Sequence, residues 1–149
     1  MQIKRLEVFD PNLLKDLIKL SQKEGFRFLD RFRTEWENGK NQFDGQGEGI
    51  FQLTINGKLV GLVGLNRDPY WQDALIGRLR RLYIHPEYRN KGLGRKLVAF
   101  ILDFAKAHFQ LITLRTDQKV AAQFYLALGF QLSKWSETET HHKWLVQQK

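Results

Sequence analysis

Apolar residues recur along the chain at two spacings, one typical of helices and one of strands. Spacings of three and four residues predict helices at about 11–24, 26–37, 93–109 and 119–128. Runs rich in branched and aromatic residues, bounded by Gly, Pro, Asn or Asp, predict strands at about 3–9, 50–55, 59–65, 75–85, 111–116, 130–135 and 140–147. The predicted order is β-α-α-β-β-β-α-β-α-β-β within a single domain, residues 1–149.

Two local signals indicate how the strands pair. Asn56-Gly57 lies between two predicted strands, and this dipeptide is typical of a tight antiparallel hairpin. The strand-helix-strand segment from Leu79 to Thr116 favours a parallel pair joined by a crossover helix. The sheet is therefore expected to be mixed.

The predicted strand at 75–85 breaks its own alternation. Leu79 has one parity and Leu82 and Ile84 have the other, with the polar pair Arg80-Arg81 between them. One extra residue at this pair, a β-bulge, would return all three apolar residues to one face and leave backbone groups unpaired. The alternative is a regular strand with one exposed leucine.

Composition and charge restrict the function. The chain has no cysteine, which excludes disulfides, thiolate metal sites and cysteine nucleophiles. No apolar run approaches the roughly 18–20 residues of a membrane span, and the first ten residues contain no apolar signal core, so we expect a soluble cytoplasmic protein with no membrane partner. The net charge of +8 indicates an anionic partner, with nucleic acid, an acidic membrane and a phosphorylated small molecule as candidates.

Most of this charge lies in one segment. Residues 78–96 carry seven cations and one anion, a net +6. Within the segment, Gly92 and Gly94 lie directly before a predicted helix. Glycines let backbone amides approach a ligand closely, and a helix start adds unpaired amides, so the turn suits a pyrophosphate; a simple tight turn is the alternative. The P-loop motif is absent, and Leu97 occupies the third glycine position of the dinucleotide fingerprint.

Two motifs in this part of the chain resemble those of a known family. The segment Leu82-Tyr83-Ile84-His85-Pro86-Glu87-Tyr88-Arg89-Asn90-Lys91-Gly92-Leu93-Gly94 is similar to the acetyl-CoA-binding motif of the GCN5-related N-acetyltransferase (GNAT) superfamily, and Ala121 to Phe130 resembles its second motif. The resemblance implies an α/β (α+β) fold whose central mixed, mostly antiparallel twisted sheet is flanked by helices. It also implies an enzyme that moves the acetyl group of acetyl-CoA, its co-substrate, to a primary amine in a ternary complex, without a metal.

The resemblance assigns roles to individual residues. The implied cofactor contacts are Leu82, Tyr83, Ile84, Arg89, Asn90, Lys91, Gly92, Leu93, Gly94, Arg95 and Gln118. The strand residues would pair with the pantetheine amides through their backbone, and the amides from Asn90 to Arg95 would bind the pyrophosphate. Gln118 stands where many members have Asn. Tyr125 matches the general acid that protonates the departing thiolate, with Phe124 expected inside and Tyr125 at the cleft.

The general base and the acceptor site are less defined. Many members carry a Glu near the bulge, where this chain has arginines. A water chain, Glu35, Glu48, Asp68, Asp73 or His85 could accept the proton of the amine. Phe43, Tyr70 and Trp71 are the predicted acceptor contacts, whereas Trp36 continues an apolar helix face and is predicted to pack.

Three further expectations concern partners. His141 and His142 are neighbours on a predicted strand and should face opposite sides of the sheet, so no shared metal is expected. The alternatives to an enzyme are a non-catalytic CoA-binding domain and a basic nucleic-acid-binding domain; the second is disfavoured because the charge gathers at one glycine turn. The acceptor would be a small-molecule or peptide amine, and the protein a monomer or homodimer.

Overall fold

A computed structural model describes residues 1–6 and 10–146. The strands are β1 Gln2–Arg5, β2 Gly49–Ile55, β3 Lys58–Arg67, β4 Ile76–Ile84, β5 Leu111–Leu114, β6 Gln131–Leu132 and β7 His141–Trp144. The helices are α1 Pro11–Lys23, α2 Phe28–Glu37, α3 Leu93–Ala105 and α4 Lys119–Ala127, with a short 3-10 helix at Pro86–Tyr88. The predicted order of elements is confirmed, while residues 7–9 and 147, placed in the first and last predicted strands, lie outside the described residues.

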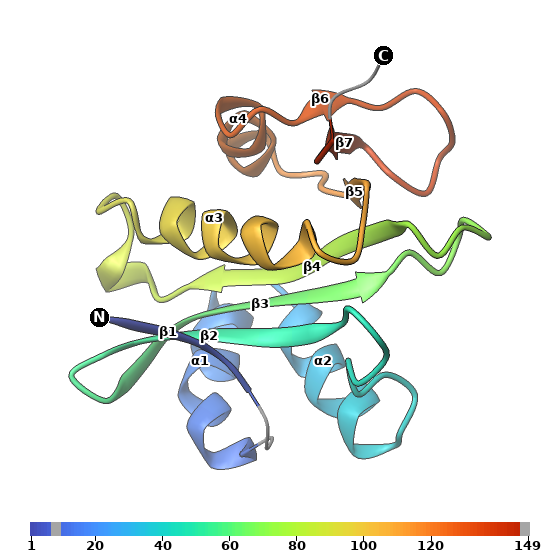
Figure 1. Cartoon of the computed structure of the whole chain (residues 1–149). Coiled ribbons are helices and arrows are strands. Elements are labelled where there is room, and N and C mark those ends of the chain that lie inside the picture. The colour runs from blue at the N-terminus through green and yellow to red at the C-terminus, as the bar shows by residue number, and fades with distance from the viewer. Residues whose placement is uncertain (7–9, 147–149) are drawn as a thin grey trace.

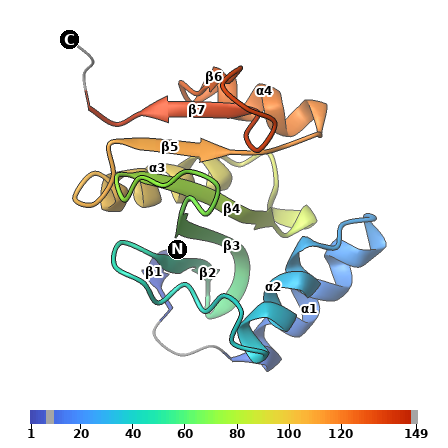
Figure 2. The same ribbon diagram turned by 90° about the vertical axis from the view of Figure 1, so that its right-hand side faces the viewer.

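The strands form one mixed sheet in the order β1-β2-β3-β4-β5-β7-β6. The pair β4–β5 is parallel and the other neighbours are antiparallel. At the β2–β3 turn, Asn56 and Gly57 have φ angles of 51° and 79°, which is the left-handed conformation that a tight hairpin requires. Helices α1 and α2 cover one face of the sheet, and α3 and α4 lie on the other (Figures 1 and 2).

Each face of the sheet has its own apolar core. Helices α1 and α2 pack Leu14, Leu17 and Phe32 against β2, β3 and β4. Helix α3 packs Leu97 and Ile101 on the opposite face, together with α4. The apolar stripes predicted for these helices are the faces that they bury. None of the helices described at residues 1–6 and 10–146 is long and apolar enough to cross a membrane.

The bulge in β4 is confirmed. Gly64 pairs with Arg80 and Leu62 pairs with Tyr83, so one residue of β3 opposes two residues of β4. Arg81 takes a φ of 65°, a left-handed conformation that is uncommon outside glycine. This extra residue brings Leu79, Leu82 and Ile84 to the face that packs against α3, as the break in alternation predicts.

Candidate active site

The parallel strands β4 and β5 separate partway along their length. They pair only from Ile76 to Arg78 of β4, although β4 continues to Ile84. The amide of His85 donates to the Val60 carbonyl at 2.7 Å, which makes Gly61–Ile84 a pair that exchanges no hydrogen bonds. The backbone amide of Ile84 therefore points away from β3, toward the side that β5 has left.

A second unpaired row of backbone groups follows β4. Within residues 1–6 and 10–146, no recorded hydrogen bond uses the amides of residues 90–95. Asn90 and Gly92 have φ angles of 63° and 76°, which curl the chain into the start of α3. The amide of Lys96 is the first to bond, to the Gly92 carbonyl at 3.1 Å. Six consecutive free amides at a helix N-terminus are suited to bind an anion.

Gly94 keeps the space beside this turn open. A Cβ atom at Gly94 would lie 3.3 Å from the ring of Phe124 and 3.7 Å from Cγ1 of Ile84. A side chain there would occupy the region between the start of α3, the end of β4 and α4. Lys91, Arg95 and Lys96 are exposed around the turn.

The Arg89 side chain bonds to the end of α1 and to β4, so it does not project freely at the glycine turn. Its two terminal nitrogens each donate to a Glu24 carboxylate oxygen at 2.7 Å, and its Nε donates to the Ile84 carbonyl at 2.9 Å. The guanidinium also lies 5.2 Å from the centre of the Tyr83 ring, and the Tyr83 hydroxyl donates to Glu24. The Arg89 side chain thus ties the end of β4 to α1. Nothing in the local sequence pattern predicts this contact, because Glu24 and Arg89 are 65 residues apart.

Replacing Glu24 with Gln should weaken this tie and destabilise the fold in a pH-dependent way. The hydrogen bonds from Arg89 hold the pKa of the Glu24 carboxyl below its ordinary value. The ionised form therefore stabilises the fold above the unfolded-state pKa of about 4.3, and this contribution is lost as the pH falls through the lowered value. Because the pair is partly exposed, we expect a loss of about 1 kcal/mol at neutral pH.

Urea unfolding of both proteins at neutral pH and at acidic pH measures this loss. Asp103→Asn is the control, because Asp103 pairs with Lys106 at 3.9 Å and its side chain is 84% exposed. Equal losses in the two variants, or a Glu24→Gln loss that persists in acid, would contradict a stabilising role for the ionised pair.

Tyr125 lies deeper than expected. Its residue is 7% exposed and its ring packs between Phe124 and Phe130, with centroids 5.2 and 5.5 Å away. Phe124 is only partly buried, so the expected order of burial is wrong: α4 turns Tyr125 further into the core than its neighbour. Burial raises the pKa of the Tyr125 phenol. No recorded hydrogen bond among the described residues uses its hydroxyl.

The three predicted acceptor contacts have different surroundings. Phe43 is 3% exposed and packs against Phe32 with a centroid distance of 5.5 Å, so its placement in the core makes it unavailable as an acceptor contact. Tyr70 is 59% exposed. Trp71 lines an apolar groove of about 310 Å³, whose other lining residues are Ile76, Leu111, Trp135 and Trp144. Trp36 packs against the core of α1 and α2, as predicted.

The comparisons with known proteins agree with this geometry. A model of the acetyltransferase (GNAT) family matches residues 13–130. The chain belongs to the GNAT acetyltransferase family. N-alpha-acetyltransferase RimI of Mycobacterium tuberculosis is 34% identical over 80 residues, which cover 50% of this chain and 47% of that protein. The chain thus matches less than half the length of this GNAT relative.

Solved structures share the GNAT fold over nearly the whole chain. A protein from Exiguobacterium sp. 255-15, described as a candidate acetyltransferase, has a TM-score of 0.85 and 29% identity, and the match covers 96% of this chain and 92% of that one. The GNAT family N-acetyltransferase YhbS from Escherichia coli, solved in complex with CoA, has a TM-score of 0.71 and 18% identity, with coverage of 97% and 81%. The second comparison shows similarity of fold alone.

The basic segment divides between the two faces of this GNAT sheet. Lys91, Arg95 and Lys96 lie by the free amides, but the three arginines of β4 (Arg78, Arg80 and Arg81) lie on the face of α1 and α2. The expectation that the charge of the segment gathers at one glycine turn is therefore wrong. Strand alternation, together with the bulge, sends these side chains away from the α3 face.

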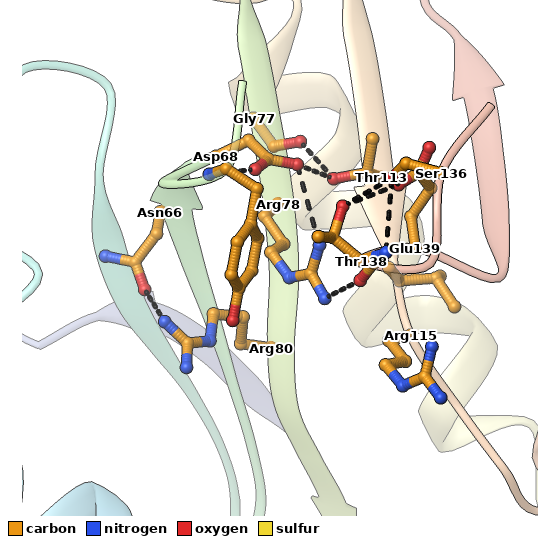
Figure 3. Close-up of polar contacts among 12 residues, drawn as sticks. Asn66, Asp68, Gly77, Arg78, Arg80, Thr113, Arg115, Ser136, Thr138 and Glu139 are labelled. Atoms are coloured by element: carbon orange, nitrogen blue, oxygen red, sulfur yellow. Dashed lines mark hydrogen bonds and ion pairs between the residues drawn. The ribbon is translucent and has the colours of Figure 1, made fainter. Parts of the chain in front are cut away.

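Each candidate base is already bonded within the protein. Glu35 pairs with Arg81 at 3.0 Å, and Glu48 accepts from the Asn66 side chain and from the amides of Gly45 and Arg67. Asp68 is buried and accepts from the Thr113 hydroxyl at 2.5 Å (Figure 3). Asp73 accepts from the Leu75 amide, and Nδ1 of His85 accepts from the Glu87 amide. Each of these side chains therefore takes part in the hydrogen bonding of the fold.

The remaining residues considered from the sequence are Gln118 and the neighbours His141 and His142. Gln118 is exposed at the N-cap of α4 and makes no side-chain capping bond. His141 and His142 are both buried, and burial lowers the pKa of each imidazole. His142 stacks on Trp135 with a centroid distance of 3.9 Å. Among the described residues, no group of three or more metal-ligating side chains gathers.

Proposed function

We propose that this protein transfers an acetyl group from acetyl-CoA to a primary amine. The observation that carries the proposal is the row of six free amides at residues 90–95, beside a gap between two parallel strands. The amides suit the pyrophosphate of CoA, and the gap suits its extended pantetheine arm. Membership of the GNAT family and the CoA complex of a protein with the same fold support this reading.

Different residues of the chain would bind different parts of CoA along the gap between β4 and β5. The unpaired backbone of β4 around Leu82 and Ile84 would bond the amides of the pantetheine arm, while Gln118 would contact the arm from α4. Lys91 and Arg95 would add charge beside the phosphates. Arg89 would act through the backbone, since its side chain holds the Ile84 carbonyl and Glu24.

The reaction needs one proton removed and one supplied. The neutral amine attacks the thioester carbonyl, a carbon–nitrogen bond forms, and the carbon–sulfur bond of the tetrahedral intermediate breaks. The nitrogen gives up its proton to water, and the departing thiolate of CoA takes a proton from water. We assign to Tyr125 the stabilisation of the departing thiolate. Its raised pKa lies above the roughly 8.5 of an ordinary thiol, so its hydroxyl stabilises the leaving thiolate mainly as a hydrogen-bond donor.

Thiol release tests the proposal directly. The protein contains no cysteine, so any thiol that appears on mixing protein, acetyl-CoA and amine comes from CoA. We expect amine-dependent thiol release and a stabilised fold: acetyl-CoA at about a hundred times its Kd adds about 2.7 kcal/mol. For a chain of this length, that raises Tm by roughly 6–10 °C. An unchanged Tm at millimolar acetyl-CoA would contradict the proposal, while stabilisation without thiol release across a broad amine panel would favour a CoA-binding domain without catalysis.

A further inference from the structure

Three arginine side chains gather on β4 beside the end of its pairing with β5. Arg78 and Arg80 share one face of the strand by alternation, with Arg78 reaching toward Thr138 and Arg80 toward Asn66 (Figure 3). The bulge brings Arg81 to the same face, where it pairs with Glu35 of α2. Arg78 is 6% exposed and lies 4.8 Å from the centre of the Tyr70 ring. Arg80 is half-buried and therefore within reach of a ligand.

The carboxylates around this cluster are too few to neutralise it. Arg78 lies 3.6 Å from Asp68, and Arg81 lies 3.0 Å from Glu35. Arg80 has no carboxylate partner among the residues described at 1–6 and 10–146; its recorded contact is the amide oxygen of Asn66 at 3.5 Å. The cluster therefore holds three guanidinium groups and two carboxylates.

Two buried nitrogens of the cluster lack a hydrogen bond. Within the described part of the chain, Nη1 of Arg78 and Nε of Arg81 are buried without a hydrogen-bond partner. The other terminal nitrogen of Arg78 donates to the Thr138 carbonyl at 2.5 Å. Burial lowers the pKa of both guanidinium groups, and the charge of Arg80 lowers that of Arg81 further. An anion bound here would offset the burial of these charges and the repulsion between them.

The cluster lies where an acceptor must approach. Pairing of β4 with β5 ends at Arg78–Thr113, so the gap that would hold the pantetheine arm ends there too. About 17 Å of strand separates this point from Ile84 at the phosphate end. Helices α3 and α4 cover one side of the sheet, and the arginines lie on the other. An amine that reaches the thioester from the face of α1 and α2 would pass Arg80.

We propose that the acceptor is a small amine that also carries a carboxylate, which Arg80 and Arg78 bind. This inference rests on the proposed acetyltransferase function and narrows its substrate class. The carboxylate balances the excess positive charge of the cluster and pairs with Arg80, the arginine without a carboxylate partner among the described residues. The same cations favour the neutral form of the attacking amine and disfavour polycationic acceptors.

Matched acceptor pairs test this inference. Thiol release would be measured with glutamate, aspartate and γ-aminobutyrate, each against the analogue in which every carboxylate is replaced by a carboxamide, and with spermidine. We expect kcat/KM to be about ten- to hundredfold higher for each acid than for its amide. Arg80→Gln should remove this preference mainly by raising KM, Arg80→Lys should retain part of it, and Arg80→Glu should reverse it. Lys15→Gln, which removes one exposed charge from α1, is the control.

The outcomes distinguish failure of this substrate inference from failure of the proposed acetyltransferase function. Equal rates for acid and amide, or acetylation of spermidine but of no acid, would overturn the inference and leave the acetyltransferase intact. The inference would also be overturned if Arg80→Gln lowered kcat/KM equally for the acid and the amide of a pair. If acetyl-CoA binds but none of these acids reacts or competes with a reacting amine, the inference is likewise wrong. Failure to bind acetyl-CoA would instead overturn the proposed function.

Discussion

Replacing Tyr125 with Phe is expected to lower kcat about a hundredfold while leaving the Kd for acetyl-CoA nearly unchanged. The hydroxyl is assigned to the departing thiolate, so its loss affects the step in which the carbon–sulfur bond breaks. Because the hydroxyl forms no recorded hydrogen bond within the described residues and the ring is buried, the substitution should change Tm by no more than about 2 °C. Steady-state kinetics and calorimetric titration measure the two quantities.

The pH dependence adds a second check on Tyr125. Burial raises the pKa of the phenol, so the hydroxyl stays protonated over about pH 6–9 and the ratio of wild-type to variant kcat should stay constant across that range. Tyr88→Phe is the control, because no recorded hydrogen bond in the described part of the chain uses the Tyr88 hydroxyl. A Tyr125→Phe protein with wild-type kcat would remove Tyr125 from the mechanism.

Replacing Gly94 with Val is expected to weaken acetyl-CoA binding at least about tenfold. The new Cβ would lie 3.3 Å from Phe124, and its branches would fill the approach to the free amides at the start of α3. Gly94 does not have a positive φ, and Val favours a helix more than Gly does, so the fold should persist. Calorimetric titration with acetyl-CoA gives the Kd.

Ala99→Val is the matched control for this change. Ala99 lies in the same helix, α3, and is exposed, so the substitution places the same side chain away from the amides. Its Kd should equal that of the wild type. A folded Gly94→Val protein that binds acetyl-CoA as tightly as the control would contradict binding at this turn.

Features set by neighbouring residues could be predicted from the sequence. The slip in alternation at Arg80-Arg81 predicts the bulge, because strand side chains alternate strictly between faces. Asn56-Gly57 predicts the hairpin for an equally local reason, since both residues must take positive φ. The glycine turn before α3 predicts the unpaired amides. Each feature depends on the conformation of only a few consecutive residues.

Features set by distant contacts could not be predicted in this way. Phe43 lies among polar and glycine residues in sequence, yet its ring occupies the space that Gly64 leaves open on β3. Glu24 reaches Arg89 across 65 positions. The count of cations in residues 78–96 gives their total charge but not the face that each side chain occupies. The orientation of Tyr125 depends on how α4 packs, which its own periodicity does not fix.

Amide chemical shifts during an acetyl-CoA titration test binding at this site most directly. In ¹H–¹⁵N spectra of the labelled protein, acetyl-CoA should move the resonances of residues 90–95, Leu82 and Ile84 most. The amides of 90–95 form no recorded hydrogen bond in the described part of the chain, and the backbone of Leu82 and Ile84 lies along the gap between β4 and β5. Saturating acetyl-CoA that moves only resonances of α1 and α2, or none at all, would contradict the site.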